Sequence, residues 1–286
     1  MGRFQRSLRL ARASWAVLQA DRELLIFPFV SFLALVAVLI TFAVPMLLVG
    51  VNLETGDTTA AGIVIGFAFY VVAYTVSFYF NTGLVGAAMI RLQGGDPTVS
   101  DGFRIANSRL PAIIGYAVIA ATVGMVLRLI SERVGILGQI IVGFLGLAWS
   151  VLTFLVVPVL VVENVGPVDA VKRSSALLRK TWGEQIIGGG GIGLVFVLVS
   201  FVVILAGIAL TVALSTISDA FLVIGIVATI LAVGAVALVG GALGGIYTAS
   251  LYRYATTGEA GDFGTDALTA AFSPKKKGRL GGLLGG

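Results

Sequence analysis

The polar residues best placed for chemistry inside the apolar stretches of this sequence are all neutral. Tyr70, Tyr74, Ser77 and Asn81 recur at steps of four, three and four residues, which places them on one face of a helix. A stripe of hydroxyls and one amide is suited to lining a wet cavity or a solute path. It is also typical of hydrogen bonds between neighbouring helices, and we favour that second interpretation.

Most familiar catalytic chemistry is excluded by composition. The chain contains no histidine and no cysteine. Those absences exclude Ser-His-Asp and Cys-His nucleophiles, histidine-ligated haem, cysteine-held zinc or iron–sulfur centres, and disulfides. No candidate base, nucleophile or metal ligand lies away from the ends of the apolar runs, and no P-loop lysine follows a glycine cluster. We therefore expect no cofactor and no enzymatic activity.

A cationic group of candidate residues precedes the first apolar run. Arg3, Arg6, Arg9 and Arg12 fall largely outside an apolar stripe made of Phe4, Leu8, Ala11, Trp15 and Leu18. An amphipathic helix of this kind lies in the membrane interface, where its arginines contact anionic lipid phosphates and Trp15 marks the depth. Regularly spaced arginines also occur in voltage sensors, but there they lie within a span, which disfavours that alternative.

The same design returns in the segment 168–182. Its predicted lipid-facing residues are Lys172, Arg173, Arg179, Lys180 and Trp182, beside an apolar stripe of Val168, Val171, Ser175, Leu178 and Trp182. Residues Arg6-Ser7, Leu10, Arg12 and Ser14-Trp15 correspond at equal spacing to Arg173-Ser174, Leu177, Arg179 and Thr181-Trp182. A weaker third copy runs from Asp101 to Arg109. The sequence therefore predicts three units, each a surface helix followed by a two-span hairpin.

The elements that position these residues follow from hydropathy. Hydrophobic residues make up 58% of the 286 residues, charged residues only 12%, and the mean hydropathy is +1.05. Runs without charged residues predict six membrane-spanning helices, at about 24–50, 60–90, 110–130, 135–162, 186–215 and 220–252. We expect an all-α, polytopic membrane helix bundle with amphipathic cytoplasmic surface helices, forming one domain over residues 1–256 and followed by a flexible basic tail at 257–286.

Charge distribution predicts the orientation of the bundle. Seventeen of the 19 basic residues flank the spans on one side, and only Arg128 and Arg133 lie on the other. The positive-inside rule then places both termini in the cytoplasm of a multi-pass protein of the cell (plasma) membrane. Because the basic residues lie beside lipid headgroups, anionic lipid is the expected partner and nucleic acid is not. A protein partner or a homo-oligomer is also compatible with the sequence.

The tail carries a cluster of cations at Lys275, Lys276 and Lys277. Its composition is typical of disorder, in which case the lysines are a solvated charge run. Alternatively they dock on anionic lipid, as the two arginine-rich segments do. Both interpretations stay open.

Proline and glycine residues within the spans allow two interpretations. Pro45, Pro158 and the glycine run 188–193 are compatible with the broken helices of transporters, whose freed backbone groups hold an ion. Small residues four apart, such as Gly240 with Gly244 and Gly241 with Gly245, are instead typical of close helix packing. We favour packing, within the chain or between copies of it.

Several short motifs resemble an uncharacterised prokaryotic six-span membrane family, the domain-of-unknown-function family six-one-five-nine. They are Ser14-Trp15 before Glu23-Leu24 and Phe27-Pro28, Asp101-Gly102-Phe103-Arg104 before Leu110-Pro111, Pro158 with Glu163, Lys172-Arg173-Ser174, and Thr181-Trp182-Gly183-Glu184. The resemblance spans nearly the whole chain and implies no substrate and no functional residues. The segment from Val168 to Gly183 also resembles cytoplasmic helices in membrane domains that accompany glycerophosphodiester phosphodiesterases, without their catalytic domain.

These observations leave two main hypotheses of function. The first is a non-enzymatic membrane scaffold that organises lipid or partner proteins through its basic surface helices. The second is a small-solute transporter or channel with a neutral polar path near Asn81. A water-accessible cavity that reaches Asn81 would favour the second, and a dry, fully packed bundle the first.

Overall fold

The computed structural model of the protein describes residues 3–50, 58–182, 192–215 and 218–259. These residues form helices and no β-strand, which confirms the all-α fold class. The α-helices are α1 Arg3–Ala20, α2 Ile26–Pro45, α3 Ala60–Leu92, α4 Val99–Ser108, α5 Leu110–Ser131, α6 Ile136–Leu152, α7 Val156–Glu163, α8 Pro167–Trp182, α9 Ile192–Ser215 and α10 Asp219–Thr257. A 3₁₀ turn, η1 (Arg22–Leu25), precedes α2, and a π-helical turn, η2 (Met46–Gly50), follows it.

Several helical stretches are long and apolar enough to cross a membrane. Among the described residues there are five: Arg22–Gly50, Ala60–Leu92, Leu110–Ser131, Ile136–Glu163 and Leu222–Thr257. The described part of α9 adds a shorter apolar stretch, Val199–Ala213. Backbone polar groups in hydrocarbon must be paired within their own segment, which is why Val-, Ile- and Gly-rich runs form helices here. The chain is therefore a membrane protein with several spans.

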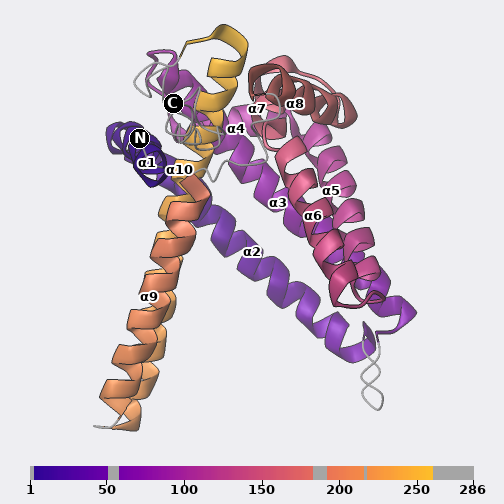
Figure 1. The fold of residues 1–286 in the computed structure, drawn as a ribbon, viewed down its shortest axis with the longest axis vertical. Coiled ribbons are helices and arrows are strands. Elements are labelled where there is room, and N and C mark those ends of the chain that lie inside the picture. The colour runs from indigo at the N-terminus through magenta and orange to yellow at the C-terminus, as the bar shows by residue number, and fades with distance from the viewer. Residues whose placement is uncertain (1–2, 51–57, 183–191, 216–217, 260–286) are drawn as a thin grey trace, which may run out of the picture.

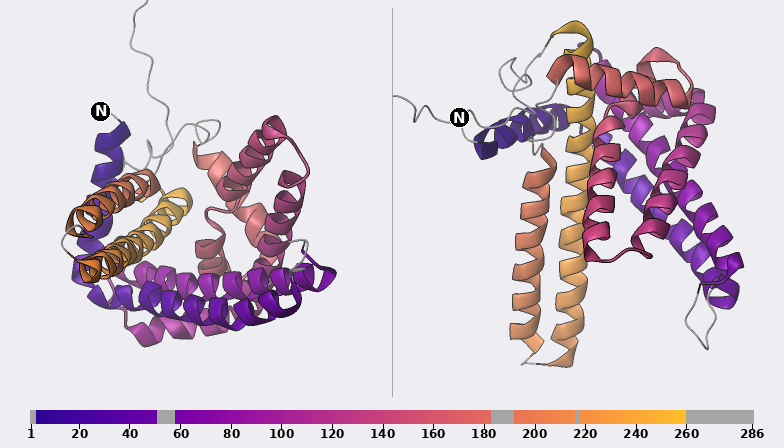
Figure 2. Two further views of the ribbon diagram at one scale, coloured as in Figure 1. Left: turned by 90° about the horizontal axis from the view of Figure 1, so that it is seen from below. Right: turned by 45° about the vertical axis from the view of Figure 1, so that its right-hand side comes forward.

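The long helices form three antiparallel hairpins, α2/α3, α5/α6 and α9/α10. Figure 1 shows that α1, α4 and α8 lie near one end of these hairpins, and we call these three the end helices. Away from that end the hairpins spread apart, and the view along them in Figure 2 shows an open, C-shaped arrangement. The described ends of the chain, in α1 and α10, both lie at the end-helix side.

Each end helix packs on the hairpin that comes before it in the chain. Helix α4 packs on α3, and α8 packs on α5, α6 and α7. Helix α1 has no preceding hairpin and packs instead on the last one, α9/α10. The three predicted units each contain one short helix and one hairpin. Because α1 packs on the last hairpin, the first unit contacts the third.

The buried core lies at the end where the end helices meet the hairpins. Its residues include Leu10, Phe27, Val85, Leu160 and Ile246, each at most 3% exposed. At the opposite ends of the hairpins, large apolar side chains such as those of Leu48, Leu137 and Ile230 are exposed. In a bilayer these side chains contact lipid, so their exposure carries no hydrophobic cost. Packing between hairpins is therefore concentrated on the end-helix side.

The fourth predicted span is divided, where the sequence predicted one helix. Helix α6 ends at Leu152 and α7 begins at Val156. Pro158 lacks an N–H and its ring clashes with the carbonyl four residues earlier, so a continuous helix cannot pass through this point. The Ser174 hydroxyl of α8 donates to the Leu152 carbonyl (2.7 Å) and accepts from the Leu155 N–H (3.0 Å). The broken-helix alternative predicted backbone groups that are free to hold an ion. Here the Leu152 carbonyl and the Leu155 N–H are freed by the break, but the Ser174 side chain already pairs with both.

The end helices bury a different face from the predicted apolar stripes. In α1 the buried residues are Leu10, Ser14, Val17 and Leu18, whereas Trp15 is 43% exposed. Since each residue advances by about 100°, the face packed on the protein lies roughly a quarter of a turn from the predicted stripe. Trp15 of the predicted stripe consequently faces outward, whereas Leu18 of the same stripe is buried.

Helix α8 repeats this arrangement. It buries Ala170, Ser174, Leu177 and Leu178, while Val168 of the predicted stripe is 53% exposed. In both helices, therefore, the predicted stripe is only partly exposed, because Leu18 of α1 and Leu178 of α8 belong to it and are buried. The periodicity of the sequence therefore did not predict which face of these helices packs on the protein.

Candidate functional site

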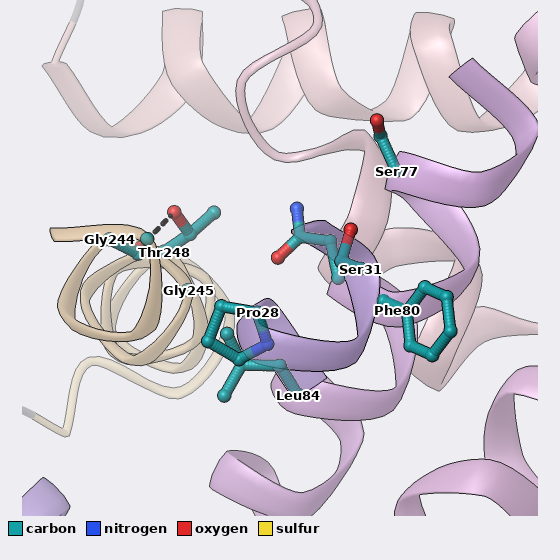
Figure 3. Close-up of a pocket in the computed structure, with 10 residues that line it drawn as sticks. Pro28, Ser31, Ser77, Phe80, Leu84, Gly244, Gly245 and Thr248 are labelled. Atoms are coloured by element: carbon teal, nitrogen blue, oxygen red, sulfur yellow. Dashed lines mark hydrogen bonds between the residues drawn. The ribbon is translucent and has the colours of Figure 1, made fainter. Parts of the chain in front are cut away.

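A cavity of about 350 Å³ lies between α2, α3 and α10, on the end-helix side of the bundle. Its lining residues are Pro28, Ser31, Ser77, Phe80, Asn81, Leu84, Gly241, Gly244, Gly245 and Thr248. Figure 3 shows Gly244, Gly245 and Thr248 of α10 on one side and the residues of α2 and α3 on the other. None of the ten lining residues is charged. The volume falls within the usual range of small-molecule sites, about 300–1,000 Å³.

The predicted polar stripe of α3 divides between two environments. Ser77 and Asn81 line the cavity. Tyr70 and Tyr74 do not; their rings stack on each other, with centroids 6.1 Å apart. The stack continues from Tyr74 to Phe78, at 5.6 Å. Half of the stripe is thus part of an aromatic column, and half is part of the cavity wall.

Hydrogen bonds distinguish the two interpretations of the stripe. The Tyr70 hydroxyl accepts a long hydrogen bond from Arg128 of α5, at 3.5 Å. The Ser77 hydroxyl donates to the Ala73 carbonyl of its own helix, at 2.8 Å. The Asn81 side chain makes no hydrogen bond with any residue that the structure describes. Bonding between helices therefore accounts for Tyr70, whereas the cavity accounts for Ser77 and Asn81.

Three glycines of α10 have different surroundings. A Cβ at Gly240 would meet the Phe196 ring of α9 at 2.9 Å, and one at Gly245 would meet Leu84 of α3 at 2.5 Å. A Cβ at Gly244 would meet nothing within 4 Å. Close packing, the favoured interpretation, explains Gly240 and Gly245, whereas Gly244 borders the open space of the cavity. The predicted glycine run 188–193 falls almost entirely outside the described residues.

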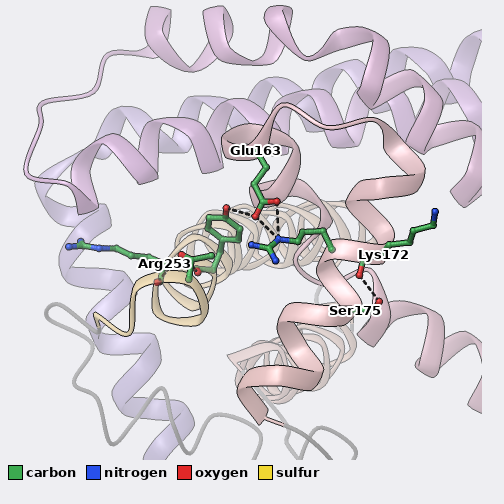
Figure 4. A network of polar contacts seen from close by, with 7 residues as sticks. Glu163, Lys172, Ser175 and Arg253 are labelled. Atoms are coloured by element: carbon green, nitrogen blue, oxygen red, sulfur yellow. Dashed lines mark hydrogen bonds and ion pairs between the residues drawn. The ribbon is translucent and has the colours of Figure 1, made fainter.

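A second polar cluster joins three elements near the end helices (Figure 4). Glu163, the last residue of α7, accepts hydrogen bonds from Arg173 of α8, whose Nε lies 2.9 Å from both carboxylate oxygens. The Tyr252 hydroxyl of α10 donates to the same carboxylate at 3.0 Å. The cluster therefore ties the second hairpin to α8 and to the third hairpin.

Two further arginines link elements distant in sequence. Arg91, near the end of α3, forms a bidentate pair with the buried Asp21 that precedes η1, and it also pairs with Asp96 at 2.7 Å. Arg253 of α10 donates to the Leu92 carbonyl at the end of α3. The Arg91 pair holds α3 to the junction between α1 and η1, and the Arg253 contact holds the third hairpin to the first.

The predicted lipid-headgroup cations are only partly free to meet lipid. Arg12, Lys172, Arg179 and Lys180 are exposed, as is Trp15. Two of these cations have acidic partners within the protein: Arg173 pairs with Glu163, and Lys172 pairs with Asp169 at 3.6 Å. The side chains of Arg3, Arg6, Arg9 and Trp182, and the residues Lys275, Lys276 and Lys277, lie outside the part of the chain that the structure describes.

Sequence reasoning missed two residues of the cavity, Ser31 and Thr248. A signal existed: Ser31 is an isolated polar residue in the first apolar run, and Thr248 follows a long run of apolar and glycine residues. Periodicity within one helix cannot show which polar residues of different helices meet. That information comes from the crossing of α2, α3 and α10.

Comparison with known proteins gives one match. The sequence model of a family, described as a family of unknown function (DUF6159), matches residues 60–263, more than two thirds of the chain. It confirms the family resemblance expected from the short motifs. No curated protein and no solved structure matches the chain.

Proposed function

The chain belongs to the family of unknown function DUF6159, and we propose that it is a non-enzymatic scaffold of the cell membrane that organises anionic lipid or partner proteins through its end helices. In this proposal α9, with 24 residues, is the sixth span. Both termini and all three end helices then face the cytoplasm, in agreement with the positive-inside rule.

The observation that carries this proposal is the set of exposed cations on the end helices. Arg104 of α4 and Lys172 of α8 are 76% and 74% exposed, although each also pairs with an aspartate three residues earlier on its own helix, and Arg12 of α1 is exposed as well. A cation near an anionic membrane surface contributes about 1 kcal/mol of attraction. Three amphipathic helices at one level, each with exposed cations, form a basic ring around the cytoplasmic ends of the spans.

Lipid selectivity tests the scaffold proposal. Purified protein is reconstituted with spin-labelled phosphatidylglycerol or phosphatidylcholine, and the fraction of motionally restricted lipid is measured by electron spin resonance. We expect wild type to select phosphatidylglycerol and the combined variant Arg3→Gln, Arg6→Gln, Arg9→Gln, Arg12→Gln to lose much of that selectivity. Arg133→Gln, on the opposite side of the membrane, is the control and should keep the selectivity for phosphatidylglycerol. Unchanged lipid selectivity and unchanged recovery of partner proteins in the fourfold variant would refute the proposal.

A second candidate function is small-solute transport, and the cavity at Asn81 favours it. An uncharged polar lining is compatible with passage of a neutral solute. Flux of neutral solutes into proteoliposomes tests this candidate, with Asn81→Leu as the variant that removes the amide. Solute flux that requires Asn81 would establish transport, and flux no greater than in protein-free vesicles would exclude it for those solutes.

A further inference from the structure

The cavity between α2, α3 and α10 contains hydrogen-bonding groups that the protein leaves unused. Among the described residues, neither the Asn81 amide nor the Ser31 hydroxyl has a hydrogen-bond partner. Thr248 and Ser77 donate to their own helices, at 2.7 Å and 2.8 Å, and keep acceptor capacity. An unpaired amide in an apolar environment is costly, so a ligand with both donors and acceptors is favoured there.

The lining excludes a charged ligand. A phosphate or an ammonium inside the hydrocarbon region requires a counter-charge, because burial of an unpaired ion is strongly unfavourable. The ten lining residues supply only hydroxyls, one amide, backbone groups and apolar surface. The exposed cations of the end helices, in contrast, lie in the headgroup layer. The cavity is therefore suited to bind an uncharged lipid headgroup, and the basic ring is suited to bind an anionic lipid headgroup.

The cavity extends from the glycerol region of a lipid into the hydrocarbon region. At about 1.5 Å per residue, Asn81 lies roughly 16 Å along α3 from Leu92, and Thr248 roughly 14 Å along α10 from Thr257. Ser31 lies roughly 8 Å along α2 from Ile26. The headgroup layer occupies about 5–8 Å on each side of a bilayer, so Ser31 lies at the glycerol and ester level, and Asn81 and Thr248 lie about 6–11 Å below that layer, in the hydrocarbon region.

We propose that this cavity binds the uncharged hydroxyl-and-ester head of a membrane glycerolipid, of which diacylglycerol is the simplest. The Asn81 amide donates to an ester carbonyl of the lipid and accepts from the lipid hydroxyl. The Ser31 hydroxyl offers a further hydrogen bond to the same head. Gly244 leaves the space that the head occupies. This inference rests on the membrane placement proposed above, but not on the anionic-lipid contacts of the end helices.

Gly244→Leu tests the site because it places a side chain in the cavity at a position where the added Cβ meets no existing atom. A Cβ at Gly244 has nothing within 4 Å. Gly234, ten residues earlier on α10, also has nothing within 4 Å and does not line the cavity. Gly234→Leu is therefore a matched control with the same change in size and helix propensity.

The experiment uses full-length protein in phosphatidylcholine nanodiscs with a photoactivatable diacylglycerol. We expect cross-links on α2, α3 and α10, competition by unlabelled dioleoylglycerol, and near-complete loss of labelling in Gly244→Leu but not in Gly234→Leu. Asn81→Leu should weaken labelling by about fivefold, equivalent to about 1 kcal/mol. Each variant that keeps the gel-filtration peak of wild type is folded. If Asn81→Leu does not fold, Gly244→Leu still tests the site.

Three outcomes overturn the site. They are equal labelling of wild type and Gly244→Leu, equal labelling by photoactivatable phosphatidic acid, and displacement of the probe by a water-soluble neutral solute but not by dioleoylglycerol. The fourfold arginine variant separates this inference from the scaffold proposal. It should lose selectivity for phosphatidylglycerol and keep the diacylglycerol labelling, so either proposal can fail while the other stands.

Discussion

The Ser174 hydroxyl on α8 accepts a hydrogen bond from the backbone N–H of Leu155, 3.0 Å away, at the break between α6 and α7. Ser174 is fully buried, and the same hydroxyl donates to the Leu152 carbonyl. One side chain thus satisfies a donor and an acceptor that the broken helix cannot pair. The contact also fixes the end helix α8 to the hairpin that precedes it.

Replacement of Ser174 by Ala should destabilise the protein. The substitution leaves the buried Leu155 N–H unpaired, at a cost of about 1–3 kcal/mol. Ser175→Ala is the matched control, because the Ser175 hydroxyl bonds only to the Lys172 carbonyl within its own helix (2.8 Å). Unfolding in mixed micelles of increasing SDS fraction measures both variants. Equal stability of the two would show that the contact to the break contributes little.

The carboxylate at the start of α4 predicts a pH dependence. Asp101 accepts hydrogen bonds from the Thr98 hydroxyl (2.7 Å) and the Thr98 N–H (3.0 Å), while its own N–H bonds back to the Thr98 hydroxyl. This capping box, with a smaller contribution from Arg104, lowers the pKa of Asp101 below its ordinary value. The stabilisation is therefore fully present above the ordinary pKa, about 3.9, and is lost as pH falls through the lower folded value.

Thr98→Val should return the pKa of Asp101 toward its ordinary value, because the variant loses the hydroxyl donor. Carbon-13 NMR of aspartate-labelled protein measures this pKa, with Asp101→Asn identifying the resonance. At neutral pH, Thr98→Val should be less stable than wild type, and the difference should shrink in acid. A titration of Asp101 that is identical in wild type and Thr98→Val would contradict the assigned role of the hydroxyl.

The cluster around Glu163 should couple the second and third hairpins energetically. Tyr252→Phe removes one hydrogen bond to the carboxylate and should cost about 1 kcal/mol. Glu163→Gln should cost more, because it also removes the ion pair with the half-exposed Arg173. A double-mutant cycle of Tyr252→Phe and Glu163→Gln measures the coupling. Additive effects of the two substitutions would mean that the contact between α10 and α7 is not energetically significant.

Close contact between α3 and α4 makes Gly102 intolerant of a side chain. A Cβ there would lie 2.7 Å from the Gly83 carbonyl oxygen and against the Phe27 ring. Gly102→Ala should destabilise by about 1–3 kcal/mol, as overpacking in cores does. Gly143→Ala on α6 is the control, since nothing lies within 4 Å of its added methyl, and it should be neutral or slightly stabilising. Thermal denaturation in detergent distinguishes them, and similar midpoints would refute the close approach.

The absence of cysteine makes the native chain a ready background for topology mapping. Ser100 of α4 and Thr58, just before α3, are both exposed and lie at opposite ends of the spans. With cytoplasmic end helices, a membrane-impermeant maleimide added to intact cells should label Thr58→Cys and not Ser100→Cys. Ser100→Cys should become reactive after permeabilisation. The reverse pattern would invert the proposed orientation.

The sequence predicted the helices of this fold because backbone groups in hydrocarbon must form their hydrogen bonds within the same segment. A long apolar run must be a helix, so the bounds of α3, Ala60–Leu92, follow closely from the charge-free run alone. The alternation of a short helix with a hairpin was also predicted, from residues that recur at equal spacing. In contrast, the pairing of the backbone groups freed between α6 and α7 depends on Ser174, which lies on another helix, 19 residues after Leu155.

The division of the polar stripe was not predictable for a similar reason. Tyr70, Tyr74, Ser77 and Asn81 share one face of α3, and helical periodicity gives no further information about them. Only the crossing of α2 and α10 near Asn81 creates a cavity there, while Tyr70 and Tyr74 stack on aromatic neighbours.

By itself the sequence determined that the chain is all-helical and has several apolar segments long enough to span a membrane, because hydropathy acts along a single segment. Only the tertiary structure decided that α1 packs on the last hairpin, that Arg173 pairs with Glu163, and that Ser31, Asn81 and Thr248 share one cavity. Those relationships depend on helix crossings between distant segments, and in a bilayer such crossings are set by side-chain packing and hydrogen bonds instead of by hydropathy.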